Sequence, residues 1–177
     1  MKPNRLLIAG LGAFAFSSVQ GQETAHVTAE NGVVLNVLAD EFAGRRDVLG
    51  PTIHLMNPRR IPSYAYVARS ISTRTSAAIT VQGELTTIGA NPSFAQITPI
   101  LRGGEALPFQ ITSRQTRECT SICSYSYHFI VQVSEHQIDN HRASGAVVIQ
   151  FRSADGTWRP TLSIPLSHFE AVRAYRG

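Results

Sequence analysis

The sequence predicts an all-β fold, an antiparallel β-sandwich or irregular barrel of about eight or nine strands with a short C-terminal helix. Three observations support this prediction. Several segments alternate apolar and polar residues with a period of two, which is typical of half-buried strands. Pairs of turn-forming residues separate some of these segments, as in short hairpins. A helical spacing of apolar residues appears at the end of the chain.

The first residues carry the pattern of an export signal. Lys2 and Arg5 precede an eleven-residue small and apolar run over residues 6–16, and a polar tail follows. As a helix this run would be about 16 Å long, roughly half the hydrocarbon thickness of a bilayer, so it is too short to span a membrane. Val19 and Gly21 then stand at the positions where a signal peptidase accepts small side chains. The pattern predicts cleavage after Gly21.

Cleavage would separate a signal peptide, residues 1–21, from a single β-rich domain, residues 22–177. The mature chain is expected to be periplasmic or extracellular, with no transmembrane segment. Loss of Lys2 and Arg5 leaves fourteen basic and twelve acidic side chains, so the formal net charge falls from +4 to +2. Nonspecific binding to nucleic acid needs a concentrated basic face, so we expect no nucleic acid partner. The oligomeric state stays open.

Period-two alternation identifies the strands in order. In the first half of the mature chain it predicts up to four strands, at residues 33–38, 52–56, 64–71 and 77–86. Residues 96–166 are predicted to form a five-stranded antiparallel meander. The clearest of its strands covers residues 124–133, in which Tyr125, Tyr127 and Phe129 alternate with polar side chains.

Turn chemistry links the strands of the predicted meander. The Gly103–Gly104 pair separates an apolar run from the next one, and the Asp155–Gly156 pair does the same further along the chain. Both pairs are typical of short hairpins. Proline cannot donate to the hydrogen-bond ladder, so prolines within strand runs indicate edge strands or bulges. These prolines are Pro99, Pro160 and Pro165.

The last residues predict a helix from His168 to about Tyr175. Ser167 followed three residues later by Glu170 has the spacing of a capping box, and Phe169 begins a short apolar stripe. We therefore expect the Ser167 side chain to cap the helix and Ser167→Ala to cost about 1 kcal/mol.

The two cysteines predict a disulfide. An even cysteine count in an exported chain favours pairing of Cys119 with Cys123. The Cα atoms of a disulfide lie about 4.4 to 6.8 Å apart, whereas an extended five-residue segment spans roughly 13 Å, so the chain must turn here. A clipped hairpin between residues 107–118 and 124–133 satisfies this requirement. Redox work or metal binding by the same pair is the alternative.

An arginine- and tyrosine-bearing segment between Arg45 and Arg74 is the leading candidate for recognition. All cations of the mature chain are arginines, and in this segment they face a single acidic residue, Asp47. Guanidinium groups bind carboxylate and phosphate in a bidentate fork, which suits an anionic partner. Solvated loops would carry the same residues without binding anything. The candidate binding residues are Arg45, Arg46, Arg59, Arg60, Tyr64, Tyr66 and Arg69.

A histidine-containing segment supplies the alternative site. His136, Asp139 and His141 lie close together in a polar stretch expected to be a loop, and His128 on the preceding strand lies near it in sequence. Imidazole and carboxylate are ligands for zinc and other divalent ions. The five-residue offset between His136 and His141 disfavours a shared face of either a strand or a helix.

No catalytic or cofactor motif is present in the sequence, so whether the protein is an enzyme stays open. We expect an exported, nonenzymatic β-sandwich without a cofactor that binds a protein or an anionic envelope component. The alternative is a small metal-dependent or other hydrolase centred on His128, His136, Asp139 and His141.

Overall fold

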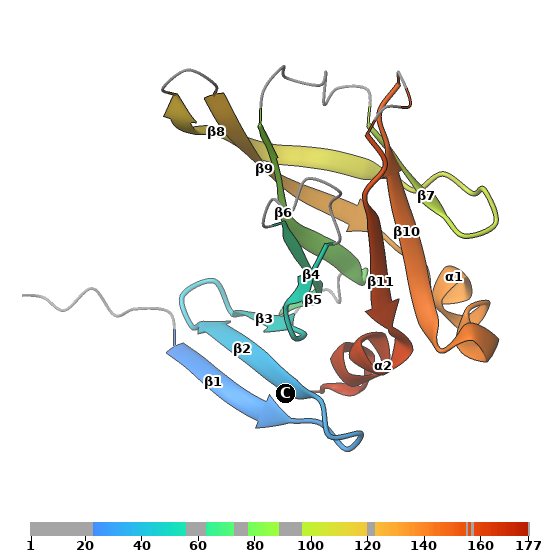
Figure 1. The fold of residues 1–177 in the computed structure, drawn as a ribbon. Coiled ribbons are helices and arrows are strands. Elements are labelled where there is room, and N and C mark those ends of the chain that lie inside the picture. The colour runs from blue at the N-terminus through green and yellow to red at the C-terminus, as the bar shows by residue number, and fades with distance from the viewer. Residues whose placement is uncertain are drawn as a thin grey trace, which may run out of the picture.

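The computed structural model describes residues 23–55, 63–72, 78–88, 97–119, 123–154, 156 and 158–176. The predicted signal peptide, Arg59, Arg60 and Arg74 therefore lie outside the described residues. The described chain forms eleven strands in two antiparallel sheets and two short α-helices (Figure 1). The fold is all-β, as the sequence predicts, and it ends in a helix.

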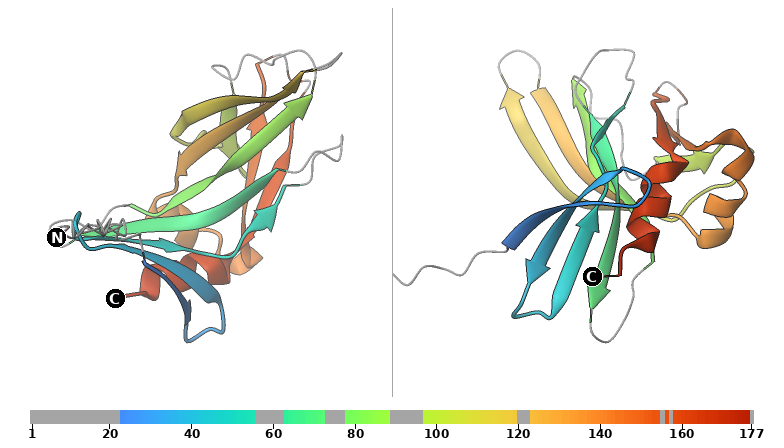
Figure 2. Two further views of the ribbon diagram at one scale, coloured as in Figure 1. Left: turned by 90° about the vertical axis from the view of Figure 1, so that its left-hand side faces the viewer. Right: turned by 90° about the horizontal axis from the view of Figure 1, so that it is seen from below.

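The larger sheet has eight strands. Its order is β1-β2-β3-β5-β6-β9-β8, and the short β4 pairs with β5 beside this path. Figure 2 shows β1 and β2 at one end of this twisted sheet and β8 and β9 at the other. The strands are β1 (Glu23–Thr28), β2 (Val34–Asp40), β3 (Arg45–Leu49), β4 (Ile53–His54), β5 (Tyr64–Ser72), β6 (Thr80–Ile88), β8 (Phe109–Cys119) and β9 (Cys123–Gln132).

The smaller sheet has three strands in the order β11-β10-β7. Two α-helices and one 3-10 turn complete the described chain. The bounds are β7 (Thr98–Leu101), β10 (Ala146–Arg152), β11 (Thr161–Pro165), α1 (Glu135–Asp139), η2 (Arg142–Ser144) and α2 (Leu166–Ala174). Helix α2 follows β11 directly and contacts β5 of the larger sheet (Figure 1).

Apolar side chains from both sheets and from α2 form one buried cluster. Aromatic contacts cross it between the sheets, because Phe129 of β9 meets Phe151 of β10 edge to face with ring centroids 5.1 Å apart. Phe109 of β8 lies 6.1 Å from Phe151 in the same arrangement. Full burial of a ring such as that of Phe129 or Phe151 contributes about 1.5–3 kcal/mol. This packing joins the two sheets as a sandwich.

Most predicted strands are found, but two more appear in the described chain. Strands β1 and β3 were not predicted, because β1 is an exposed edge strand with few apolar residues and β3 begins with Arg45 and Arg46. The hairpin between β8 and β9, closed by the Cys119–Cys123 disulfide, is confirmed, and its Cα atoms lie 4.1 Å apart. The hairpin between β10 and β11 is also confirmed.

The predicted five-stranded meander is wrong. Strands β7, β10 and β11 belong to the smaller sheet, whereas β8 and β9 belong to the larger one. The Gly103–Gly104 pair does turn the chain, since both residues have left-handed φ angles of 120° and 97°. However, β7 pairs with β10 and not with β8. A turn signal fixes the direction of the chain but not the sheet that the next strand joins.

The predicted cap of the last helix is also wrong. Helix α2 begins at Leu166, its N-cap residue is Pro165, and no side chain caps it. A capping box exists instead at Ser134 and Gln137, where it starts α1 in the segment expected to be a loop.

Proline marks edge strands as predicted. Pro99 lies in β7 and Pro165 in β11, the two edges of the smaller sheet. Within the described ranges, no helix is both long and apolar enough to cross a membrane.

Candidate functional site

The alternation of strands β3 and β5 divides the candidate binding residues between two faces of the larger sheet. Val67 of β5 is buried in the core, and Arg69 shares its parity and pairs with the buried Val48. We call this the core-facing side and the opposite surface the outer face. Arg46 also belongs to the core-facing side by register, although it is exposed. The outer face carries Arg45, Tyr64 and Tyr66.

Arg45 is engaged by its own sheet. Its Nη2 lies 3.0 Å from Oδ2 of Asp47, and the Ser70 hydroxyl donates to Oδ1 of the same carboxylate at 2.5 Å. Burial raises the pKa of the Tyr66 phenol, and the nearby Asp47 charge raises it further. Arg45 and Tyr66 thus belong to a local network around Asp47, and the predicted patch is not one surface.

A buried carboxylate, Glu84, occupies the centre of the outer face. It is only 4% exposed. Its Oε2 accepts from the Tyr64 hydroxyl at 3.2 Å, and its Oε1 accepts from Ser126 Oγ at 2.7 Å and from Thr86 Oγ1 at 3.3 Å. His128 is its neighbour across the β6–β9 pair. Tyr64, Glu84 and His128 therefore form one row of side chains across β5, β6 and β9, which we call the Glu84 row. The sequence analysis assigned Tyr64 and His128 to two different candidate sites.

The Glu84 network has the character of a structural element. A buried carboxylate is costly unless hydrogen bonds satisfy it, and three hydroxyl groups do so here. This burial could not be predicted from the sequence, because Glu84 follows Thr80 and Gln82 in the polar phase of its strand. Only the register of the strands shows that Tyr64 and Ser126 contact the same carboxylate.

The histidine segment does not gather its side chains. Nε2 of His136 lies 3.1 Å from Asn140 Nδ2, and Nδ1 of His141 lies 2.8 Å from the Gln137 carbonyl oxygen. His128 lies in the Glu84 row on β9. Among the described residues, no group of three or more His, Cys, Asp or Glu side chains is placed to hold a metal ion.

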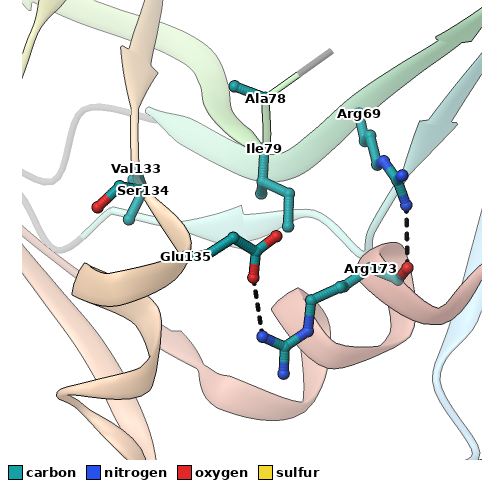
Figure 3. Close-up of a pocket in the computed structure, with 7 residues that line it drawn as sticks. All are labelled: Arg69, Ala78, Ile79, Val133, Ser134, Glu135 and Arg173. Atoms are coloured by element: carbon teal, nitrogen blue, oxygen red, sulfur yellow. Dashed lines mark hydrogen bonds and ion pairs between the residues drawn. The ribbon is translucent and has the colours of Figure 1, made fainter. Parts of the chain in front are cut away.

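A pocket of about 410 Å³ lies where α1 and α2 meet the core-facing side of the larger sheet (Figure 3). Arg69 of β5 reaches it and donates from Nη1 to the Arg173 carbonyl oxygen at 2.9 Å. Arg173 of α2 donates from its own Nη1 to Glu135 Oε2 of α1 at 2.8 Å. The lining residues are Arg69, Ala78, Ile79, Val133, Ser134, Glu135 and Arg173.

The charged side chains around the pocket are linked by hydrogen bonds and ion pairs. The hydrogen bond from Arg173 to Glu135 raises the pKa of the guanidinium. An arginine side chain is charged at any physiological pH. Asp139 is 3.3 Å from the same Nη1 and also accepts from Arg142 at 3.0 and 3.1 Å. Hydrogen bonds from Arg142 and then Arg173 lower the pKa of the Asp139 carboxyl.

A second, larger hollow of about 820 Å³ lies between the β1–β2 hairpin and α2. Arg173 lines this hollow as well as the pocket. Val27 and Leu35 from the hairpin and Ala171 and Tyr175 from the helix supply much of its apolar lining.

Comparison of the chain with protein-family models, with curated proteins and with solved structures finds no match. The fold and the pocket define it as a β-sandwich whose arginine-lined pocket opens where two short helices meet the larger sheet.

Proposed function

We propose that the chain is an exported, nonenzymatic binding module and that the pocket between Arg69 and Arg173 receives an anionic group of its partner. The partner is a protein or an envelope component that carries a carboxylate or a phosphate. The observation that carries the proposal is that two arginines, from β5 and α2, line one pocket, where the Arg69 guanidinium donates to the backbone carbonyl of Arg173.

The chemistry of the lining supports an anionic group with an apolar neighbour. Guanidinium groups bind carboxylate and phosphate through geometrically matched hydrogen bonds. Ala78, Ile79 and Val133 give the pocket an apolar part that would contact the carbon skeleton next to the anion. Pockets that bind small molecules are commonly apolar with a few well-placed polar groups.

The local charge balance favours an anion over a cation. Among the residues that line the pocket, Arg69 and Arg173 are basic and Glu135 is acidic. Basic side chains therefore outnumber acidic ones in the lining. Of the candidate binding residues in the described chain, Arg69 is the one that lines the pocket.

The test is a titration of the isotopically labelled protein with inorganic phosphate and with acetate, followed by NMR. We expect shifts around Arg69 and Arg173. Arg69→Gln should weaken binding about tenfold, which is about 1.4 kcal/mol. Arg46→Gln is the matched control, because Arg46 is an exposed arginine on the neighbouring strand that does not line the pocket. Equal affinity of the two variants would contradict the proposal.

The nature of the partner is tested with vesicles. Binding to vesicles of phosphatidylglycerol but not of phosphatidylcholine would identify an envelope lipid, whereas binding to an acidic peptide alone would identify a protein. Unchanged binding after Arg59→Ala and Arg60→Ala would leave the pocket as the sufficient site. Stoichiometric zinc in protein purified without chelators would instead favour the metal-dependent hydrolase and overturn the nonenzymatic function.

A further inference from the structure

Besides the two-residue β4, four described strands lie at the ends of the two sheets, and three of these four carry features that discourage pairing with another chain. Strand β8 is interrupted by register shifts between Ile111 and Ser113 and again further along the strand. Strand β7 contains Pro99, and β11 ends with Pro165. Bulges and prolines are common protections of sheet edges, because they break the row of backbone hydrogen-bonding groups.

Strand β1 forms the fourth edge and lacks these protections. It pairs with β2 in six consecutive positions without a register shift. Its sequence, Glu23–Thr28, contains no proline, glycine or basic residue apart from one histidine. Its residues are exposed except for the half-buried Val27, and no described strand pairs with its other side. In Figure 1, β1 lies at the margin of the larger sheet.

We propose that β1 is a homodimer interface, in which two copies of the chain pair their β1 strands antiparallel about a twofold axis. The two larger sheets would then continue into each other. A twofold contact uses the same surface on both copies and closes after two subunits, so it satisfies both edges at once. Strand addition of this kind draws its affinity from main-chain hydrogen bonds and its selectivity from the side chains.

The side chains of β1 select one register. With the twofold axis normal to the sheet, odd-numbered residues face odd-numbered ones, because opposite residues share a face of the sheet. Centring the pair on His26 places Thr24 opposite Thr28 and Ala25 opposite Val27. A shift of the centre to Ala25 would instead place the Glu23 carboxylate opposite Val27.

The His26-centred register makes continuous rows across four strands. Within one copy, Ala25 pairs with Val37 and Val27 pairs with Leu35. Val37 and Leu35 are buried, at 4% and 1% exposure. In the dimer the row therefore runs from Val37 and Ala25 of one copy to Val27 and Leu35 of the other, and twofold symmetry repeats it. On the outer face, Thr24 and Thr28 form cross-strand pairs of a favourable type.

The interface is tested by the oligomeric state of the exported full chain, measured by sedimentation over a range of concentrations. We expect a monomer–dimer equilibrium. His26→Lys places two permanent like charges opposite each other at the axis and should raise the dimer dissociation constant about fivefold or more. Asn36→Lys is the matched control, because Asn36 pairs with His26 one strand further in. It should leave the equilibrium nearly unchanged.

A second variant tests the register directly. His26→Cys places one thiol from each copy at the twofold axis, so oxidation should give a covalent dimer. Asn36→Cys should not, because that position is one strand away from the junction. A monomer at all concentrations, a dimer insensitive to His26→Lys, or equal cross-linking of the two cysteine variants would each overturn the proposal. The circular dichroism spectrum of each variant verifies that the sandwich has folded.

Discussion

The two α-helices of the described chain are held in place by different forces. Helix α1 has five residues and one buried side chain, Ile138, but its first turn is closed by a complete capping box. Helix α2 has nine residues and no side-chain cap, but it buries four side chains. Isolated helices this short are unstable in water, so each needs an outside contribution. The capping box stabilises α1, and packing of its buried face stabilises α2.

The proposed anion pocket depends on both helices. Glu135 is in the first turn of α1, next to the capping residue Ser134, and Arg173 is in the last turn of α2. Their ion pair therefore connects a helix fixed at its start to a helix fixed by its buried face. Substitutions in the capping box of α1 or in the buried face of α2 should each displace one residue of the Glu135–Arg173 ion pair. The loss of unfolding free energy should differ between the two helices, which distinguishes capping from packing.

The largest effect is expected from Phe169→Ala in α2. Phe169 is fully buried between the helix and the sheets, and deletion of such a ring costs about 3–5 kcal/mol through lost burial and the cavity left behind. The free energy of unfolding measured in urea checks this. Glu170→Ala is the control on the same helix, expected within about 0.5 kcal/mol of the wild type. A loss below 1 kcal/mol for Phe169→Ala would show that packing is not the anchor of α2.

A pH-dependent effect is expected next, also in α2. Burial lowers the pKa of His168, and its Nδ1 is buried without a hydrogen-bond partner. Because the folded pKa lies below the unfolded value of about 6.5, the unfolded chain takes up a proton first as the pH falls. The stability contributed by neutral His168 is therefore complete above about pH 6.5 and decreases as the pH falls toward the folded pKa.

The measurement is the free energy of unfolding between about pH 8 and pH 5, for the wild type and for His168→Gln. The difference between the two proteins should change in favour of the variant as the pH falls. Parallel curves would contradict the assignment, because the remaining histidines are common to both proteins.

The sequence predicts the existence of α2 but not its anchor. The Ser167–Glu170 spacing matches a capping box, yet the helix already begins at Leu166, so Ser167 is inside the first turn and cannot cap it. The Ser134–Gln137 spacing matches equally well and forms the box. Both pairs satisfy the pattern, and what separates them is where the preceding strand ends, which depends on tertiary pairing.

The same limit applies to the candidate site. The alternation in β5 separates Tyr64 and Tyr66 from the residues that face the core. It does not show that Arg69 meets Arg173, which is 104 residues away in sequence. The burial of Glu84 could not be predicted for a similar reason, since it depends on hydrogen-bond partners from β5 and β9. Local patterns fix which residues share a face, whereas the pocket depends on contacts between distant elements.

The smallest effects are expected at the two serines that match the capping pattern. In α1, the Ser134 hydroxyl accepts from the Gln137 backbone N–H at 3.2 Å, and the Gln137 side chain accepts from the Ser134 backbone N–H at 2.8 Å. Ser134→Ala removes half of this box and should cost about 1 kcal/mol in unfolding free energy. It should also loosen the adjacent Glu135 and weaken its ion pair with Arg173.

Ser167→Ala is the matched variant in α2 and should change the unfolding free energy by less than about 0.5 kcal/mol. The Ser167 backbone carbonyl accepts from Asn31 Nδ2 at 2.9 Å, and alanine retains that carbonyl. Urea unfolding of both variants under the same conditions makes the comparison. If Ser167→Ala were the more costly of the two, the end of α2 and not its buried face would be the anchor, and the contrast between the helices would be lost.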